Sequence, residues 1–332
     1  MKFLRNKRSS WRATTLVGAL AAGLILAACG DGIDEPEAPA DPDPAPAEEA
    51  PGEEADDAAA GNVGEGQTIS IGWMPWEEAI AVTNLWHVIL EANGYEVDQQ
   101  QLDPGIVFSG IASGDLDIFL DAWLPITHEQ YIDQFGADIE DLGPWLADAP
   151  LTWAVPTYVD GVDSLADLAD NADLFDGTIV GIEPGAGLTR ISLEEVIPAY
   201  GLGDSFELIE SSTPAMLAEL DAAYANEEPI VVTLWRPHPA YGRYDLKDLE
   251  DPENALGDAD QIHAVARTGF TADHPEVAAA LENFFFEHDV FAPLNTAIDD
   301  APDGGKLDAA RTWVEANRDI VEGWLEGTGL GL

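Results

Sequence analysis

The stretch TISIGWMPWEEAIAVTNLWHVILEANG, residues 68–94, decides the class of the fold. Its first residues alternate between polar and apolar side chains, as a strand with one buried face does. From Glu78 to Asn93 the large apolar side chains recur at helical spacing, and Gly94 follows where helices commonly terminate. The stretch therefore predicts a strand followed by a helix, with Trp76 in the turn between them.

The same order of strand and helix recurs along the chain. Strands are predicted at 68–73, 95–102, 117–120, 178–182, 206–209, 230–234 and 262–266, and helices at 78–93, 107–113, 188–200, 214–226, 275–286 and 306–325. Thr213 is predicted to cap the helix that begins at Pro214, because a hydroxyl can satisfy a free amide at a helix start. Such alternation indicates an α/β protein with open, mainly parallel sheets flanked by helices.

The strand–helix series occurs twice, which predicts two lobes. Residues 67–155 together with 250–332 are assigned to lobe one, and residues 156–249 to lobe two. The backbone must then cross between the lobes twice, near 155–157 and within 245–260. A cleft between two such lobes is a natural ligand site, and strand ends are where α/β proteins bind ligands.

The N-terminal segment indicates export. Residues 1–28 begin with basic side chains and continue as an apolar run that is short for a membrane span of about 20 residues, which is typical of a signal peptide. The run ends Leu26-Ala27-Ala28-Cys29, which resembles a bacterial lipobox, whose Cys receives a lipid. The alternative is a secretory signal with an incidental Cys. Cys29 is the only Cys of the chain, so an intrachain disulfide is excluded.

Residues 29–66 are predicted to be a disordered tether. After Cys29 this segment is rich in Pro, Ala, Gly and acidic residues and contains no aromatic residue, Lys or Arg. Such a composition cannot bury enough apolar surface to fold. We therefore expect a solvated connection between a lipid anchor and a folded body that begins near Gln67.

The charge of the chain is extreme. There are 64 acidic and 13 basic side chains, and five of the basic ones precede Cys29, where there are no acids. From Cys29 onward, eight basic side chains stand against 64 acidic ones, a formal charge of −56. Salt screens such self-repulsion, since the Debye length is about 3 Å at 1 M. The composition indicates a salty habitat or, alternatively, merely an acidic extracytoplasmic protein, and it argues against a nucleic-acid partner.

Tryptophan and proline occur together in four segments near the ends of apolar runs, at 72–76, 121–128, 151–156 and 234–238. Several rigid aromatic faces pointing inward would hold a cation that donates no hydrogen bond, such as a quaternary ammonium. Packing in the core is the alternative for any single one of these residues. It is the preferred interpretation for Trp73, Trp86, Trp145 and Trp153.

Six motifs, in order, resemble the glycine betaine substrate-binding proteins of ABC importers. They are IGWMPWEEAIAVT (71–83), GYEV (94–97), SGDLDIFLDAWLPITH (113–128), VPTYV (155–159), GIEPGAGL (181–188) and WRPH (235–238). The resemblance covers about residues 68–325 and implies a two-lobed type II periplasmic-binding-protein fold that closes around its ligand. It also implies a lipid-anchored receptor on the extracytoplasmic face of the cell membrane, which delivers a betaine to an ABC permease and its ATPase for osmoprotection.

The resemblance implies the site residues as well. A cage for the trimethylammonium group maps to Trp76, Trp123 and Trp235, and the ligand carboxylate maps to His128 and the backbone amides of Gly187 and Leu188. Exposed backbone before a helix start is, independently of the resemblance, a suitable carboxylate site. Pro239 stands where relatives often carry an aromatic residue, which bears on the width of the pocket.

Other interpretations remain for several polar residues. Without the resemblance, His128 is better interpreted as a helix-start residue with local hydrogen bonds. His238 closely follows Trp235 and is interpreted either as a residue that supports the site from behind or as a structural one. The alternation of Asp115, Asp117 and Asp121 fits solvated acids on a strand and lacks the calcium-loop pattern. No P-loop lysine, His-Glu-x-x-His pair or nucleophile elbow occurs, so no catalytic residue, metal or cofactor is predicted, and an enzyme is disfavoured.

Within the receptor class, the identity of the ligand stays open. Choline, carnitine and proline betaine are alternative ligands for the same class of importer. A sensory lipoprotein without transport is the remaining alternative.

Overall fold

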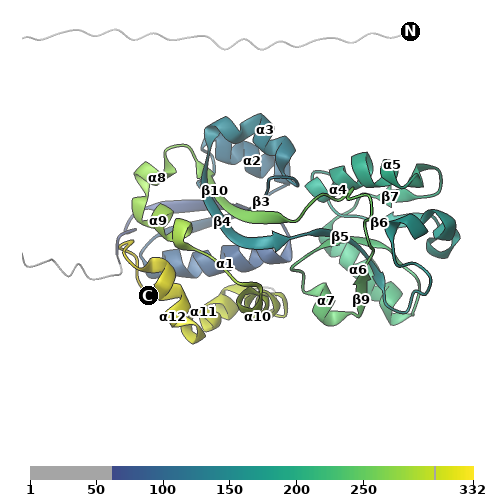
Figure 1. The fold of residues 1–332 in the computed structure, drawn as a ribbon. Coiled ribbons are helices and arrows are strands. Elements are labelled where there is room, and N and C mark those ends of the chain that lie inside the picture. Colours follow the sequence, from purple (N-terminus) through teal and green to yellow (C-terminus); the bar gives the residue numbers. More distant parts are fainter. Residues whose placement is uncertain (1–61, 303) are drawn as a thin grey trace, which may run out of the picture. The chain divides into compact units, whose positions relative to one another are not determined.

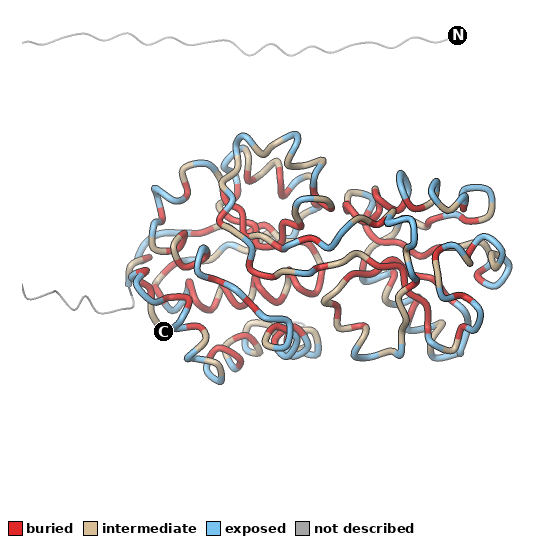
Figure 2. The backbone as a smooth tube through the Cα atoms, viewed as in Figure 1, coloured by how far each residue is buried: buried red, intermediate tan, exposed pale blue. Residues whose placement is uncertain are grey.

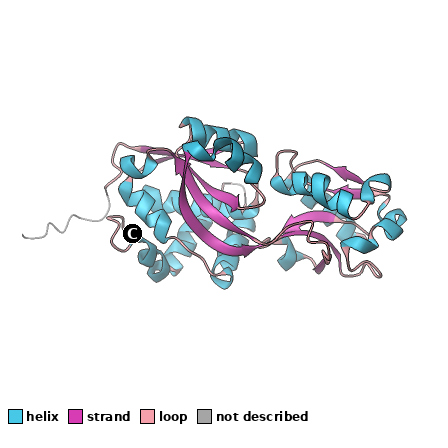
Figure 3. Cartoon of the chain, turned by 45° about the horizontal axis from the view of Figure 1, so that its top comes forward, coloured by secondary structure: helices cyan, strands magenta, loops and turns pink. Residues whose placement is uncertain are grey.

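The structure, a computed structural model, describes residues 62–302 and 304–332. The predicted signal peptide, Cys29 and most of the predicted tether lie outside these residues. Two five-stranded sheets, each with its own helices, form the frame of the described chain (Figures 1 and 3). The predicted α/β class with two sheets is confirmed.

The first sheet has the strand order β2-β1-β3-β10-β4. Its strands are β1 (Thr68–Trp73), β2 (Glu96–Gln101), β3 (Ile118–Leu124), β4 (Ile139–Ala149) and β10 (Asp260–Arg267). Its helices are α1 (Glu77–Ala92), α2 (Pro104–Ser113), α3 (Glu129–Phe135), α8 (Phe270–Asp273), α9 (Pro275–Asn283), α10 (His288–Asp299), α11 (Lys306–Ala316) and α12 (Arg318–Leu325). In Figure 1, α2 and α3 lie on one side of this sheet, and α1, α10 and α11 on the other.

The second sheet has the strand order β7-β6-β8-β5-β9. Its strands are β5 (Leu151–Pro156), β6 (Thr178–Val180), β7 (Glu207–Ile209), β8 (Val232–Trp235) and β9 (Leu246–Asp248). Its helices are α4 (Gly187–Ile191), α5 (Ile197–Ala199), α6 (Thr213–Ala225) and α7 (Ala240–Arg243), and a π-helical turn at Ser192–Val196 joins α4 to α5.

Each sheet is half parallel and half antiparallel, so the prediction of mainly parallel sheets is wrong. β1 runs parallel to β2 and β3, whereas β10 runs antiparallel to β3 and β4. In the second sheet, β6 runs parallel to β7 and β8, whereas β5 runs antiparallel to β8 and β9. The parallel halves come from strand–helix–strand units. The antiparallel halves form where β4 leads into β5 and where the chain returns from β9 to β10.

The first crossing between the sheets lies earlier than the sequence indicated. Leu151–Pro156 pairs with β8 and β9 in the second sheet, so the backbone crosses near Pro150 instead of at 155–157. This strand has no polar alternation, because nearly all of its residues are buried, and the usual signal of a strand is therefore missing. The second crossing, between β9 and β10, falls within the predicted range.

Other departures from the predicted elements have local causes. β4 was not predicted because Gly143 and Pro144 interrupt its pattern, and its pairing with β10 shifts register there. α10 was not predicted because Pro293 lies inside it, where proline normally ends a helix. The predicted helix at 306–325 is two helices, which meet at Asn317.

The cap of α6 also differs from the prediction. Ser212, one residue before Thr213, is the N-cap, and its Oγ accepts the N–H of Ala215 at 3.3 Å. The Thr213 hydroxyl instead donates to Glu183 at 2.9 Å. Either of the two adjacent hydroxyl residues could have capped the helix. Thr213 is instead bonded to the buried carboxylate of Glu183, so Ser212 is the residue that caps it.

Aromatic side chains fill the interior beside the first sheet. Trp145 of β4 stacks on Phe284 with 5.6 Å between ring centroids. Phe284 and Phe286 each meet Trp324 edge to face, at 4.9 and 5.0 Å. We call these four residues the aromatic core. Figure 2 shows, in red, how buried residues run through the interior of the body. Of the tryptophans interpreted as core residues, Trp86, Trp145 and Trp153 are fully buried, whereas Trp73 is partly exposed.

The first described residues already pack on the body. Gly64 donates its N–H to the carbonyl of Asn93 at 2.9 Å, and a Cβ on Gly64 would lie 2.3 Å from the ring of Tyr95. The packed chain therefore begins ahead of the predicted start near Gln67. Across 62–302 and 304–332, no helix has both the length and the apolar composition needed to cross a membrane.

Candidate ligand-binding site

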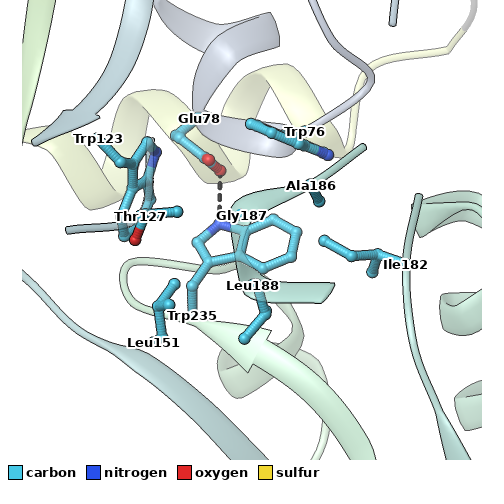
Figure 4. A pocket seen from close by; sticks show the side chains of 10 residues that line it. All are labelled: Trp76, Glu78, Trp123, Thr127, Leu151, Ile182, Ala186, Gly187, Leu188 and Trp235. Atoms are coloured by element: carbon cyan, nitrogen blue, oxygen red, sulfur yellow. Dashed lines mark hydrogen bonds between the residues drawn. The ribbon is translucent and has the colours of Figure 1, made fainter. Parts of the chain in front are cut away.

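A cavity lies where residues of the two sheets meet. Its volume is about 270 Å³, which includes space open to the solvent. Its lining comes from the first lobe through Trp76, Glu78, Trp123 and Thr127, and from the second through Leu151, Ile182, Ala186, Gly187, Leu188 and Trp235. Figure 4 shows the side chains of Trp76, Trp123 and Trp235 around this space.

Strand ends bring the three tryptophans to the cavity. Trp76 stands between β1 and α1, Trp123 lies near the end of β3, and Trp235 is the last residue of β8. β1 and β3 are parallel, so their carboxyl ends meet at one edge of the sheet. The rings of Trp76 and Trp235 lie 6.3 Å apart between centroids, inclined by 60°. We call Trp76, Trp123 and Trp235 the Trp cage.

Each indole N–H of the Trp cage donates to a buried carboxylate. The bonds are Trp76 Nε1 to Glu183 Oε2 (3.1 Å), Trp123 Nε1 to Asp121 Oδ1 (3.0 Å) and Trp235 Nε1 to Glu78 Oε2 (2.7 Å). The first and third bonds join one lobe to the other. Two rings of the cage therefore gain these hydrogen bonds only when the lobes are in contact.

Two of these carboxyls resist ionisation. Burial raises the pKa of Glu78 well above its usual range, and the Asp121 and Glu77 carboxylates raise it further, against the opposing hydrogen bond from Trp235. Burial also raises the pKa of Asp121. Glu78 Oε1 and Asp121 Oδ2 are buried and have no hydrogen-bond partner within the described chain. A cation in the cavity would favour the charged forms of both groups.

A helix start with unpaired amides forms another part of the cavity wall. α4, the π-helical turn and α5 make one continuous helical run from Gly187 to Ala199. In the part of the chain that the structure describes, the amides of Gly187 and Leu188 donate to no protein acceptor. A Cβ on Gly187 would lie 2.0 Å from the carbonyl oxygen of Thr127, so only glycine permits this approach of the lobes. Such amides bind carboxylates well.

His128 lies behind the Trp cage and is not part of the cavity wall. Its ring is fully buried and stacks on Trp76 with 5.9 Å between centroids and 13° between planes. Nδ1 accepts the backbone N–H of Trp123 at 2.9 Å, so the neutral ring carries its proton on Nε2. Burial, assisted by the Arg190 guanidinium, lowers the pKa of His128 to about 3. Nε2, which has no partner in the described residues, is therefore a hydrogen-bond donor at neutral pH.

The structure thus brings five of the six predicted ligand-binding residues to one cavity: Trp76, Trp123, Trp235, Gly187 and Leu188. His128 contacts the cavity indirectly, through Trp76. Pro239 is not among the lining residues. His238 Nε2 lies 3.0 Å from Glu77 Oε2 of the other lobe without a hydrogen bond between them, and His238 Nδ1 accepts the N–H of Ala240 at 3.0 Å, which suits the structural interpretation.

Sequence reasoning missed the carboxylates that hold the cage. Asp121, interpreted as a solvated acid, is buried, and Asp117, interpreted in the same way, pairs with Arg267 at 2.8 Å. Glu183 and Glu78 are 107 and 157 residues away from the tryptophans that they bind, so no local signal could pair them. Only Asp121, two residues before Trp123, carried a usable signal.

Comparison with known proteins assigns these features to one family. Residues 67–316 match the family described as the substrate binding domain of the ABC-type glycine betaine transport system, OpuAC. The glycine betaine/carnitine transport binding protein GbuC of Listeria monocytogenes is 37% identical over 151 residues, which is 45% of this chain and 49% of that protein. The chain thus spans about half the length of this curated relative in the match.

Solved structures share the fold over a longer range. Lactococcal OpuAC, in its closed-liganded conformation complexed with glycine betaine, is 29% identical with a TM-score of 0.71, covering 78% of this chain and 100% of that one. An ABC-transporter choline binding protein in complex with choline is also 29% identical with a TM-score of 0.71, covering 80% and 92%. The two-lobed arrangement is the type II periplasmic-binding-protein fold. The chain belongs to the family of substrate-binding domains of ABC-type glycine betaine transport systems.

Proposed function

We propose that this protein is the receptor of an ABC importer, which captures glycine betaine or a related quaternary-ammonium zwitterion outside the cytoplasm. The carrying observation is a single cavity lined by the Trp cage and by the unpaired amides of Gly187 and Leu188. A quaternary ammonium has diffuse charge and apolar methyl groups, and each aromatic face contributes about 0.5–2 kcal/mol to holding it. Burial of the methyl groups adds to this.

The negative end of the ligand belongs at the helix start. We assign the carboxylate to the amides of Gly187 and Leu188, with the Nε2–H of His128 as a third donor. Because His128 lies behind Trp76, its contact with the ligand requires the cavity to widen on that side. The site would then recognise both ends of a zwitterion, and a ligand without a carboxylate would leave these donors idle.

Capture is coupled to closure of the lobes in this proposal. Besides the two indole–carboxylate bonds that cross between the lobes, Tyr131 Oη donates to the carbonyl of Gly185 at 2.7 Å. A ligand held by residues of both lobes stabilises the closed arrangement. We propose that this closed form is what the permease recognises.

The remaining parts of the proposal rest on the sequence. Lipidation at Cys29 would hold the protein at the extracytoplasmic face of the cell membrane, with the acidic segment after it as a tether. The partners are the permease and ATPase subunits of the importer, and nucleic acid is not a partner. A receptor performs no covalent chemistry, so we propose that the protein is not an enzyme and uses no cofactor.

Choline is the second candidate ligand. The observation that favours it is the buried carboxyl of Glu78 in the cavity wall, which suits a cation whether or not the ligand carries its own anion. The choline binding protein with the same fold supports this candidate.

Calorimetric titration of the purified protein with glycine betaine, proline betaine, carnitine and choline tests the proposal. We expect glycine betaine to bind more tightly than choline and to be recovered unchanged, as judged by NMR. Binding of none of these compounds would refute the proposal, and turnover of a betaine would favour an enzyme. Neighbouring genes for a permease and an ATPase would distinguish a transport receptor from a sensory lipoprotein.

A further inference from the structure

We infer that Glu78 is a ligand-contacting residue of the Trp cage, whose carboxylate meets the quaternary ammonium group and selects for its charge. The inference rests on the proposed function, because it names the protein group that faces the positive end of that ligand. It adds an anionic contact to a site otherwise made of aromatic faces and backbone donors.

The position of Glu78 carries the inference. Glu78 lies in the first turn of α1, is fully buried, and lines the cavity. Oε2 is held by the indole N–H of Trp235 at 2.7 Å (Figure 4). Oε1 has no hydrogen-bond partner in the described residues. A buried carboxylate oxygen left in this state is costly, and a nearby cation compensates it without donating a hydrogen bond.

The other two carboxylates of the cage differ from Glu78. Glu183 accepts from the Thr213 N–H at 2.9 Å, the Thr213 hydroxyl at 2.9 Å and the Trp76 indole at 3.1 Å, and it does not line the cavity. Asp121 has an unpartnered oxygen but does not line the cavity either. Glu183 is therefore a positioning residue for Trp76, and of the three carboxylates only Glu78 combines a cavity-facing side chain with an unpartnered oxygen. The Thr127 hydroxyl also lines the cavity without a partner in the described residues, but it carries no charge.

The electrostatics around Glu78 agree with this assignment. The groups that face it are Asp121 on β3, Glu77 beside it on α1, and the indole of Trp235 on β8. Burial comes first among the causes that raise the pKa of Glu78, and the two carboxylates add to it. Burial and the neighbouring carboxylates therefore oppose ionisation of Glu78 in the empty site, and an arriving cation favours the ionised form.

A charge-removing substitution and three ligands that differ in charge test the inference. Glu78→Gln keeps the size of the side chain and an acceptor for Trp235, but carries no charge. The ligands are glycine betaine, choline and 3,3-dimethylbutanoate, in which carbon replaces the charged nitrogen of betaine. Calorimetry with the whole protein should show at least tenfold weaker binding of glycine betaine and choline to Glu78→Gln. Binding of 3,3-dimethylbutanoate should not weaken.

Glu183→Gln is the matched control, because it alters a carboxylate that only positions a ring. We expect it to weaken all three ligands, including 3,3-dimethylbutanoate, because a displaced Trp76 ring loses contact with the methyl groups of each. Thermal melting establishes that each variant is folded.

Two results would overturn the inference: a loss below twofold for both cations, or equal losses for all three ligands. If Glu78→Gln does not fold, Glu78→Asp replaces it, and the retained carboxylate should preserve the preference for choline over uncharged 3,3-dimethyl-1-butanol. Loss of that preference in folded Glu78→Asp would equally refute the role. Failure of the wild type to bind either cation would instead refute the proposed function.

Discussion

The aromatic core and the Trp cage use the same kind of side chain in opposite ways. In the core, Trp145, Phe284, Phe286 and Trp324 pack ring against ring beside one sheet, and Trp145 donates its N–H to the backbone carbonyl of Leu120 at 2.6 Å. In the cage, the rings surround an empty space, and their N–H groups donate to carboxylates. In the core, the rings pack on one another and the Trp145 N–H is paired within the protein. In the cage, ring faces line an empty space, and Glu78 and Asp121 each keep an unpartnered oxygen, so that these groups remain available to a proposed ligand.

If the proposed function holds, the difference marks where stability has been exchanged for binding. Buried carboxyls with unpartnered oxygens, such as Glu78 and Asp121, destabilise an empty protein. The same groups favour a bound cation. If this comparison holds, substitutions in the two regions should separate cleanly into effects on folding and effects on binding.

The largest effect is expected from Trp145→Ala in the aromatic core. Trp145 is fully buried, and its removal leaves a cavity beside Phe284. We expect the free energy of unfolding to fall by about 3–5 kcal/mol. Chemical denaturation measures this change, and the affinity of the remaining folded protein for glycine betaine should stay within about twofold. A large loss of affinity in the folded variant would show that the aromatic core also contributes to ligand binding, contrary to the comparison.

Alanine substitutions in the Trp cage should weaken ligand binding and leave the fold intact, which is the opposite of the effect expected in the core. Trp76→Ala, Trp123→Ala and Trp235→Ala should each weaken betaine binding by about 1–3 kcal/mol, from lost cation–π attraction and burial. Their folds should remain intact by circular dichroism, and calorimetry gives the affinities. Unchanged affinity in two of the three variants would rule out the cage.

His128→Ala sharpens the comparison within the site itself. Loss of the Nε2–H should weaken glycine betaine by about 1.5 kcal/mol and choline much less, since only betaine has a carboxylate. With a pKa of about 3, the ring stays neutral from pH 8 to pH 5, so its contribution should be constant over that range. Titrations with both ligands across these pH values provide the test. Equal losses for the two ligands would leave His128 a structural role alone.

The smallest effect is expected from salt, which acts on the surface and not on either aromatic region. With 64 acidic and 13 basic side chains in the chain, added NaCl should raise the melting temperature by screening repulsion. Choline affinity should fall with salt, because screening removes the attraction of the protein for a cation. Betaine affinity should change less, because the ligand is net neutral. A melting temperature that falls with NaCl would contradict the inferred adaptation to salt.

Much of the fold could be predicted from local pattern, and the failures have physical reasons. β1 and α1 followed directly from alternation and helical spacing of their apolar residues, although both elements are largely buried. β5 was missed because nearly all of it is buried, and α10 because it tolerates Pro293. The three tryptophans and the glycine turn at 185–187 could be assigned from motif resemblance, and the structure places Trp76, Trp123 and Trp235 around one cavity.

The sequence by itself determined the α/β class, the export-like N-terminus, the acidic character and the residue types suited to a quaternary ammonium ligand. These properties follow from composition, spacing and short motifs, which are local. Only the tertiary structure decided that His128 stands behind Trp76, and that Glu183 and Glu78 hold tryptophans from the opposite lobe. The physical reason is that a hydrogen bond between groups more than 100 residues apart depends on how two sheets meet, and no local pattern encodes that geometry.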